Sequence, residues 1–270
     1  MKALCFDVGG TYLKYGIVEN YEVIYFNKER TNKENVDEQI NNIINNFEVS
    51  AIAIGFAGIV KNNKVLFAPN VKTFQEKELK LKTDKKVIID NDANLFTLGE
   101  YTKLKNYKNV IGITIGTGVG GGIIINGNLY RGNGGAGEIG HITIDPNGPI
   151  CNCGNFGCIE AYIGEDYFPR YFESIFKKRL KAKELFELAK NGDLNALEFW
   201  KWFSDKLSIL INNLCNIFDP DVIVIGGGVS NAFEIFSNYL KLKHNVIIKK
   251  SELGEYASLI GGYELLKYGY

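Results

Sequence analysis

The sequence predicts an α/β protein in which buried strands alternate with amphipathic helices. Three observations lead to this prediction. Short apolar runs predict buried strands, glycine-rich turns directly follow some of these runs, and apolar residues recur at helical spacing between them. The order of strand, glycine turn and returning strand occurs near the start of the chain and begins again at Val110.

The first cycle begins with a buried strand over residues 3–6. A tight turn at 9–11 and a returning strand at 13–18 complete a hairpin, because paired glycines permit the positive φ angles of short turns. Apolar residues then recur at helical spacing within residues 34–47, which predicts a helix. The apolar run 51–54 predicts the next buried strand.

A polar junction follows the next strand. Residues 87–89 are typical of a short strand and residues 93–104 of a helix, with Asn91 and Asp92 between them. Both residue types are favoured at helix N-termini. Since polar side chains at such a junction usually face a cleft, we expect a cleft beside Asn91 and Asp92.

The second cycle comprises a strand over 110–115, a glycine-rich turn over 116–122 and a returning strand over 123–125. The sequence contains no Pro- or Ser-rich linker, so a domain boundary near residue 108 is predicted from the restarted cycle alone. Four later elements complete the pattern: a helix over 193–218, a strand over 222–225, a third glycine turn at 226–228 and a final helix over 256–267.

Composition describes an ordinary globular protein of one large domain or two modest lobes. The chain has 270 residues, 46% hydrophobic and 23% charged, with 31 basic and 31 acidic residues, so bulk charge recruits neither nucleic acid nor an anionic membrane. No apolar run reaches the roughly 18 residues of a membrane span. Because Met1 leads directly into a strand-like segment instead of a basic signal-peptide start, we expect a cytoplasmic protein.

Glycine turns after buried strands indicate phosphate binding, since backbone N–H groups approach phosphate oxygens where no Cβ intervenes. Gly-Gly also occurs in many plain hairpins, but the second such loop favours a pair that grips a triphosphate, with the third turn beside the adenosine. An acid at the strand end would hold hydrated magnesium. The turns match neither the Walker pattern nor the dinucleotide fingerprint. The predicted nucleotide-binding residues are Asp7, Gly9, Gly10, Thr11, Lys14, Gly116, Thr117, Gly118, Gly226, Gly227 and Gly228.

Three cysteines and a histidine are typical of a zinc site. His141, Cys151, Cys153 and Cys158 offer four ligands, which close a tetrahedral coordination sphere and make the site structural. Incidental cysteines and a redox pair are the alternatives, but the two closest thiols lack the usual Cys-x-x-Cys redox spacing. A ligated imidazole keeps its second nitrogen free, so His141 would present an oriented hydrogen bond to a sugar hydroxyl.

Asp92 is the best-placed general base. An alcohol that attacks phosphorus needs a carboxylate to accept its proton, while positioning and charge neutralisation supply most of the rate. Taken by itself, the Asn91–Asp92 pair also fits a plain helix cap.

Taken together, these residues resemble the ROK family of sugar kinases, repressors and open reading frames over nearly the whole chain. The cysteine–histidine cluster is the most specific part of the resemblance, and Ala57, in place of a family proline, departs from it. The motifs that carry the resemblance are residues 7–11, 55–58, 90–94, 116–122, 137–141, 151–160 and 226–228.

The resemblance implies the actin-like ATPase (ribonuclease-H-like) fold, with two lobes around a central cleft. The smaller lobe would comprise residues 1–108 and the C-terminal helix at about 256–270, and the larger lobe residues 109–255. The cofactors would be ATP, Mg²⁺ and structural Zn²⁺, and the family suggests a homodimer or higher homo-oligomer. Asp92 would be the general base, and the sugar would be held by Gly58, Asn70, Asn91, Asp92, Glu138, His141 and Glu160.

The expected activity is phosphorylation of glucose at its 6-hydroxyl. Fructose, mannose, N-acetylglucosamine and N-acetylmannosamine stay open as substrates, because pocket walls discriminate only about 1–3 kcal/mol per group. ROK repressors carry a helix-turn-helix domain before the first glycine loop, for which this sequence leaves no room ahead of Asp7. A non-catalytic sugar sensor is the alternative of another class.

Overall fold

The computed structural model describes residues 1–61, 64–67, 75–77 and 79–269. These form two compact units, each assembled from separate stretches of chain. The first unit comprises Met1–Lys108, Gly122–Gly137 and Leu253–Tyr270, and the second comprises Asn109–Gly121 and Glu138–Glu252.

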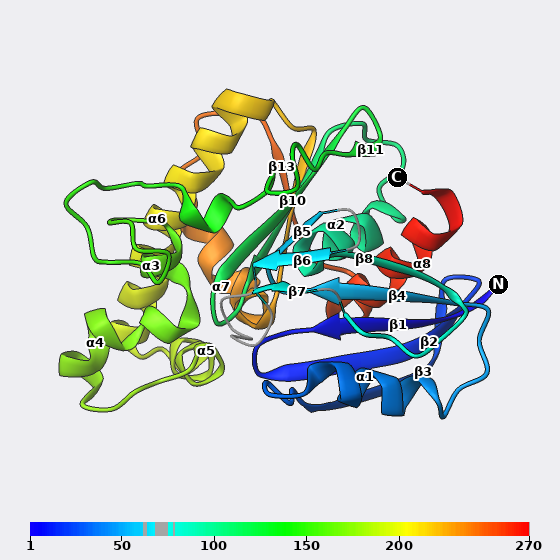
Figure 1. The fold of residues 1–270 in the computed structure, drawn as a ribbon. Helices are drawn as coiled ribbons and strands as arrows, with labels where there is room; N and C mark the ends of the chain where they lie inside the picture. Colours follow the sequence, from blue (N-terminus) through cyan, green and yellow to red (C-terminus); the bar gives the residue numbers. More distant parts are fainter. Residues whose placement is uncertain (62–63, 68–74, 78, 270) are drawn as a thin grey trace. The chain divides into compact units, whose positions relative to one another are not determined.

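A five-stranded sheet forms the centre of the first unit (Figure 1), in the order β3-β2-β1-β4-β8. Strand β1 pairs antiparallel with β2, and parallel strands β4 and β8 continue the sheet on its other side. Strand β4 is buried throughout, as its continuous apolar run predicts for a central parallel strand. The strands are β1 (Lys2–Val8), β2 (Tyr12–Glu19), β3 (Glu22–Arg30), β4 (Ala51–Phe56) and β8 (Lys86–Asn91).

Alternating side chains of β1 pack against different helices. Leu4 and Phe6 share a core with helix α1 (Val36–Ile44), whereas Ala3 and Cys5 share one with helix α8 (Ala257–Tyr268). Successive side chains of a strand point to opposite faces, so the two helices cover opposite faces of the sheet.

Helix α2 (Asp92–Tyr101) and α8 cross at unusually short range. A Cβ at Gly99 would overlap the carbonyl of Ala257, and one at Gly261 would overlap that of Leu95. The two glycines therefore allow backbone to pack against backbone, which holds α2 at the end of the sheet.

The second sheet repeats the topology of the first, with the order β11-β10-β9-β12-β13. Strand β12 pairs parallel with both β9 and β13, as β4 pairs with β1 and β8. The cycle predicted to restart at Val110 is thus confirmed. The strands are β9 (Val110–Ile115), β10 (Val119–Ile125), β11 (Asn128–Leu129), β12 (Val222–Gly226) and β13 (Ile247–Lys250).

Aromatic side chains of helix α6 (Leu194–Phe218) form much of the second unit's core. Phe199, Trp200 and Phe203 are fully buried, and the rings of Phe168 and Phe236 from neighbouring segments pack against them. The predicted long helix is confirmed, with Asp193 capping its start. Further helices are η1 (Ile139–His141), α3 (Glu160–Ile163), η2 (Glu165–Tyr167), α4 (Pro169–Phe176), α5 (Ala182–Lys190), η3 (Gly228–Ala232), α7 (Phe233–Phe236), η4 (Ser237–Tyr239) and η5 (Gly254–Tyr256).

Several elements differ from the predictions. Strand β10 begins at Val119, so the second glycine turn is only residues 116–118. Gly122 lies within the strand, where glycine is needed because Thr97 and Ala93 of α2 leave no room for a Cβ. The predicted helix over 93–104 ends at Tyr101. Strands not predicted are β3, an edge strand without clear alternation, the short β11, β13, and a small antiparallel sheet of β5 (Ile59–Lys61), β6 (Lys64–Phe67) and β7 (Gln75–Lys77).

Among the described residues, every helix is too short or too polar to cross a membrane.

Candidate active site

At the junction between β8 and α2, two neighbouring polar residues, Asn91 and Asp92, have different roles. Asn91 is the N-cap of α2, and its Oδ1 accepts the N–H groups of Ala93 and Asn94 at 2.9 and 3.0 Å. Asp92 is the first helical residue, and one carboxylate oxygen accepts the Ala93 N–H at 2.9 Å. The capping role belongs to Asn91, so a helix cap no longer accounts for the carboxylate beside it. The partial positive charge of the helix N-terminus favours an anion there.

Asn91 also holds the loop that follows β4. Its Nδ2 donates to the Gly58 carbonyl at 2.9 Å, and Gly58 has a φ of 149°, which favours glycine. At the end of β4, a Cβ at Gly55 would lie 3.4 Å from the Asp92 Cα, so this strand also approaches α2 closely. The structure thus brings Gly58, Asn91 and Asp92 together. The predicted sugar-binding residue Asn70 lies outside the described residues.

The first glycine loop forms the predicted tight hairpin between β1 and β2. The Gly9 N–H donates to the Tyr12 carbonyl at 3.0 Å, and the Thr31 hydroxyl donates to the Gly9 carbonyl at 2.7 Å. Gly10 and Thr11 form the remainder of the turn, where Thr11 is exposed. A rigid turn with an exposed hydroxyl suits a phosphate ligand.

Lys14 lies opposite Asp7 in the β1–β2 register, and its Nζ is 3.1 Å from Asp7 Oδ2. Burial lowers the pKa of Lys14, but the carboxylate of Asp7 and the more distant Glu255 and Asp92 raise the pKa above its ordinary value overall. Lys14 therefore stays charged among these acids, and Asp7 carries a cationic partner where magnesium was predicted.

Backbone hydrogen bonds fix the second glycine loop, which has open space beside its first residue, Gly116. The Gly116 N–H donates to the Gly118 carbonyl at 3.0 Å, while the Gly116 carbonyl accepts the Glu165 N–H at 2.8 Å. Between Gly116 and Gly118, the Thr117 carbonyl accepts the backbone N–H of Asp166 at 3.4 Å. Among the described residues other than its chain neighbours, no atom lies within 4 Å of a Cβ added at Gly116, so the described structure leaves space for a ligand beside the loop.

The third glycine turn ends β12. Gly226 is the last strand residue, Gly227 has a φ of 82°, and Gly228 begins η3 instead of belonging to a simple turn. A Cβ at Gly227 would overlap the Ile115 carbonyl at the end of β9, whereas one at Gly228 would meet no described atom within 4 Å beyond its chain neighbours. Glycine at 227 is thus required by the fold, and Gly228 leaves open space.

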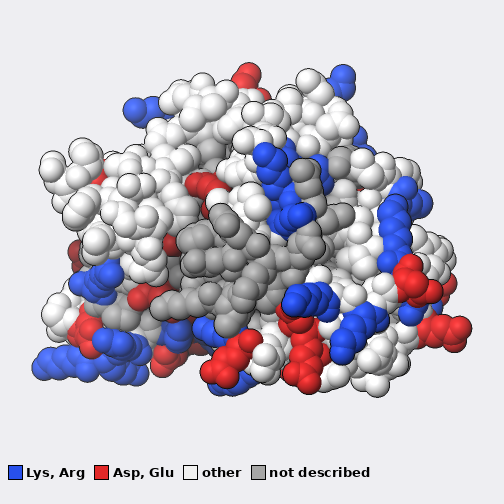
Figure 2. All heavy atoms as spheres, viewed as in Figure 1, with Lys and Arg blue, Asp and Glu red and all other residues white. Residues whose placement is uncertain are grey.

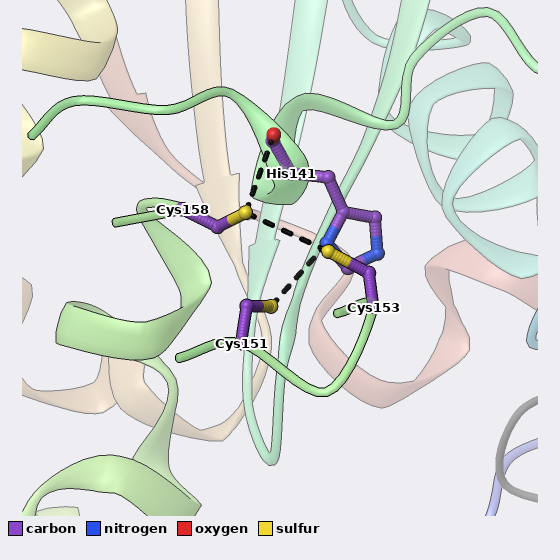
Figure 3. Close-up of side chains that lie close together, drawn as sticks. All are labelled: His141, Cys151, Cys153 and Cys158. Atoms are coloured by element: carbon purple, nitrogen blue, oxygen red, sulfur yellow. Dashed lines mark hydrogen bonds between the residues drawn. The ribbon is translucent and has the colours of Figure 1, made fainter. Parts of the chain in front are cut away.

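The four predicted metal ligands converge in the second unit (Figure 3), with their ligand atoms all within 4.8 Å of one another. Cys153 Sγ lies 3.6 Å from Cys158 Sγ, and Cys151 Sγ lies 3.7 Å from His141 Nδ1. Two sulfurs each about 2.3 Å from a tetrahedral zinc lie about 3.8 Å apart. The donor set and its spacing therefore fit zinc.

The imidazole of His141 uses its two nitrogens differently. Nδ1 faces the cysteines, whereas Nε2 lies 3.9 Å from Glu138 Oε2. Burial raises the pKa of Glu138; His141 opposes this shift and Glu160 adds to it. Metal coordination through Nδ1 leaves Nε2 available beside a carboxylate, an arrangement that suits hydroxyl recognition.

Glu160 connects the cysteine cluster to the second glycine loop. Its Oε2 accepts the Val119 N–H at 2.9 Å, and its Oε1 lies 3.8 Å from Cys151 Sγ. Gly118 packs so closely on this carboxylate that a Cβ there would overlap it. The structure thus groups Glu138, His141 and Glu160 within the second unit and attaches the last of these to the end of a glycine loop.

Sequence reasoning did not assign a role to Asp90 or Arg131, which form an ion pair beside Asn91. One signal was available, because Asp90 directly follows the apolar run 87–89 and a buried carboxylate requires a partner. The partner itself lies 41 residues away, and no local pattern identifies it.

Comparison with solved structures defines the class of fold. The crystal structure of a ROK family glucokinase from Streptomyces griseus in complex with glucose and AMPPNP superposes with a TM-score of 0.88 at 28% identity, over 98% of this chain and 99% of that chain. The predicted actin-like fold is confirmed. Residues 3–268 match the ROK family, and the chain belongs to this family.

Two curated relatives are each 33% identical. The glucokinase of Thermotoga maritima matches over 95% of this chain and 91% of its own length. The N-acetyl-D-glucosamine kinase of Pectobacterium atrosepticum matches over 86% of this chain and 85% of its own length. The family also includes regulators: the xylose repressor of Bacillus subtilis is 30% identical over 91% of this chain and 69% of its own length.

Proposed function

We propose that this protein is an ATP-dependent sugar kinase that transfers the γ-phosphoryl group to a hexose hydroxyl, with Asp92 as general base. The observation that carries the proposal is the arrangement at the start of α2, where Asn91 caps the helix and Asp92 supplies a carboxylate. Family membership and kinase relatives of two sugar specificities support it.

In this mechanism Asp92 accepts the proton of the attacking hydroxyl as the new O–P bond forms, while the bond between the γ-phosphorus and the bridging oxygen of ATP breaks and ADP leaves with that oxygen. Positioning and charge neutralisation supply most of the rate enhancement of phosphoryl transfer. The turns at 9–11, 116–118 and 226–228 would donate backbone N–H groups to ATP, and Lys14 would add a positive charge. Asp7 would hold Mg²⁺, which neutralises phosphate charge when bound.

The sugar would be held by Gly58, Asn91, Glu138, His141 and Glu160, with Asn70 as a further predicted contact. Carboxylates accept hydrogen bonds from ring hydroxyls, and the imidazole Nε2 donates or accepts according to its tautomer. Zinc held by the three cysteines and His141 would fix the orientation of that imidazole and would activate no water, since all four positions are filled by protein ligands.

Within this class we propose glucose, phosphorylated at the 6-hydroxyl, as the preferred substrate. The carboxylates of Glu138 and Glu160 and the imidazole of His141 would form hydrogen bonds with the ring hydroxyls, while Asp92 would face the primary alcohol. The glucokinase relatives support this assignment, whereas the N-acetylglucosamine kinase relative supports an acetamido sugar equally by identity.

The test is ADP release with Mg-ATP across glucose, fructose, mannose, N-acetylglucosamine and N-acetylmannosamine. We expect the highest kcat/KM with glucose. Turnover only with an acetamido sugar would overturn glucose but retain the kinase, and no turnover with any sugar would overturn the kinase.

A sugar-binding regulator is the second candidate, favoured by the repressor relative. Calorimetric titration of the same sugars distinguishes the two functions. Sugar binding without ADP release supports a sensor, whereas binding accompanied by turnover supports the kinase.

A further inference from the structure

A charged pair joins the segment 122–137 to the strand that leads into Asp92. Nε and Nη2 of Arg131 lie 2.7 and 2.6 Å from Oδ2 of Asp90. Asp90 is only 5% exposed, so its charge depends on this partner. Nothing in the proposed chemistry requires either residue to touch sugar or ATP.

The second carboxylate oxygen of Asp90 contacts the residues on both sides of Asp92. Asp90 Oδ1 accepts the Asn91 N–H at 2.8 Å and the Asn94 side-chain amide, also at 2.8 Å. A carboxylate is planar, so a guanidinium that holds Oδ2 also fixes the direction of Oδ1. Arg131 therefore acts on the first turn of α2 through one rigid group.

We propose that Arg131 is a positioning residue for Asp92, acting through Asp90. The inference rests on the proposed function, because it assigns Asp92 the role of base. Without the guanidinium, the buried carboxylate would lose its charged partner and turn toward water, which weakens its bonds to Asn91 and Asn94. A displacement of about 1 Å in a catalytic group lowers the rate on the order of 100-fold.

The same segment has a second anchor, which supplies a matched control. Lys61 Nζ donates to Asn133 Oδ1 at 2.6 Å, and Gly134 packs against Val60 and Lys61. This anchor contacts β5, and neither of these two contacts includes Asp90 or a residue of α2. Loss of Lys61 therefore loosens the segment without removing the partner of Asp90.

Steady-state kinetics test the proposal. We expect Arg131→Gln to lower kcat about 10- to 100-fold while sugar KM changes by less than about 3-fold. Arg131→Lys should recover part of the loss, because it keeps the charge but not the planar fork. Lys61→Gln should stay within about twofold of wild type. A kcat for Arg131→Gln near that of wild type, or an equal loss in Lys61→Gln, overturns the proposal.

A double-mutant cycle separates positioning of the base from general loosening. In the Asp92→Asn background, Arg131→Gln should change the residual rate of phosphoryl transfer by less than about 3-fold, since no base is left to position. An undiminished effect in that background would show that Arg131 acts on something other than Asp92.

An activity-independent measurement keeps this inference distinct from the proposed function. Amide hydrogen exchange of the unliganded protein should be faster at Asn91 and Asn94 in Arg131→Gln than in wild type, and unchanged there in Lys61→Gln. If wild type turns over no sugar, the proposed function fails, and the exchange result alone decides whether Arg131 fixes this turn. Unchanged exchange in Arg131→Gln would reject it.

Discussion

At the start of α2, neighbouring Asn and Asp side chains perform separate tasks. The Asn91 side-chain amide uses both of its polar atoms: its oxygen accepts hydrogen bonds from N–H groups of the first helical turn, and its nitrogen donates one to the carbonyl of Gly58. Asp92 is thus left with a carboxylate that need not cap the helix. Lys14 lies close enough for the charge of Asp92 to raise its pKa, so the proposed base has a cationic neighbour.

Asp92→Asn is the residue-scale prediction. Asparagine keeps an oxygen that accepts the Ala93 N–H, so the fold and sugar binding should persist, whereas kcat should fall about 100- to 10,000-fold. Coupled measurement of ADP release and calorimetric sugar titration checks both parts. The exposed Asp84→Asn serves as the control and should retain wild-type kcat. Near-normal turnover in Asp92→Asn would remove this residue from the mechanism.

At the scale of elements, the crossing of α2 and α8 holds the Asp92 helix against the sheet. The crossing depends on glycine at 99 and 261, where each backbone meets a carbonyl of the other helix. Because the two backbones meet directly at Gly99 and Gly261, a side chain at either position would push the helices apart.

We expect Gly261→Ala to lower the free energy of unfolding by at least about 2 kcal/mol, because its methyl group would overlap the Leu95 carbonyl and backbone yields little. Denaturant titration measures the change. Gly135→Ala is the matched control, since a Cβ there meets no atom of the described part of the chain within 4 Å apart from its chain neighbours, and it should change stability by less than about 0.5 kcal/mol. Equal stabilities of the two variants would contradict this view of the crossing.

The proposed zinc site of the cysteine–histidine cluster can be tested directly. Protein purified without added metal should contain about one zinc per chain by elemental analysis. Cys158→Ser should lose that zinc and melt at a lower temperature, because structural zinc contributes to folding. Cys215→Ser is the control: this buried cysteine of α6 lies outside the cluster and should leave the zinc content unchanged. The site would be refuted if the purified wild-type protein contained no zinc and its stability did not change when a chelator was added.

At the scale of the molecule, two sheets of the same strand order occur in one chain. Each unit is assembled from separate stretches, so the chain passes between them more than once. The lobe division at residues 108 and 255, the first of them suggested by the restarted cycle, and the homodimer or higher homo-oligomer suggested by the family both stay predictions. Lys and Arg are interspersed with Asp and Glu on the face seen in Figure 2.

With 31 basic and 31 acidic residues, the chain lacks the net positive charge that drives nonspecific DNA binding. We therefore expect no shift of duplex DNA in a gel assay at low salt, with or without sugar. A basic DNA-binding protein run in parallel serves as the positive control. Retention of DNA, abolished by sugar, would instead favour the regulator function.

Local patterns predicted much of the candidate site. Glycines after buried strands, an Asn–Asp pair before a helix and a Cys₃His set each follow from backbone or ligand chemistry within a few residues. The convergence of His141 with three cysteines therefore agrees with expectation. The second glycine loop was predicted too long, because the need for glycine at 122 comes from α2 packing on the strand and not from a turn.

The amino-acid sequence by itself determined the alternation of elements and indicated the proposed metal ligands and the proposed base, because each depends on neighbours along the chain. Only the tertiary structure decided that Asn91 and not Asp92 caps the helix, that Glu160 binds the end of a glycine loop, and that Arg131 is the partner of Asp90. These contacts join residues whose side chains meet only when the strands and helices pack, so no local periodicity encodes them.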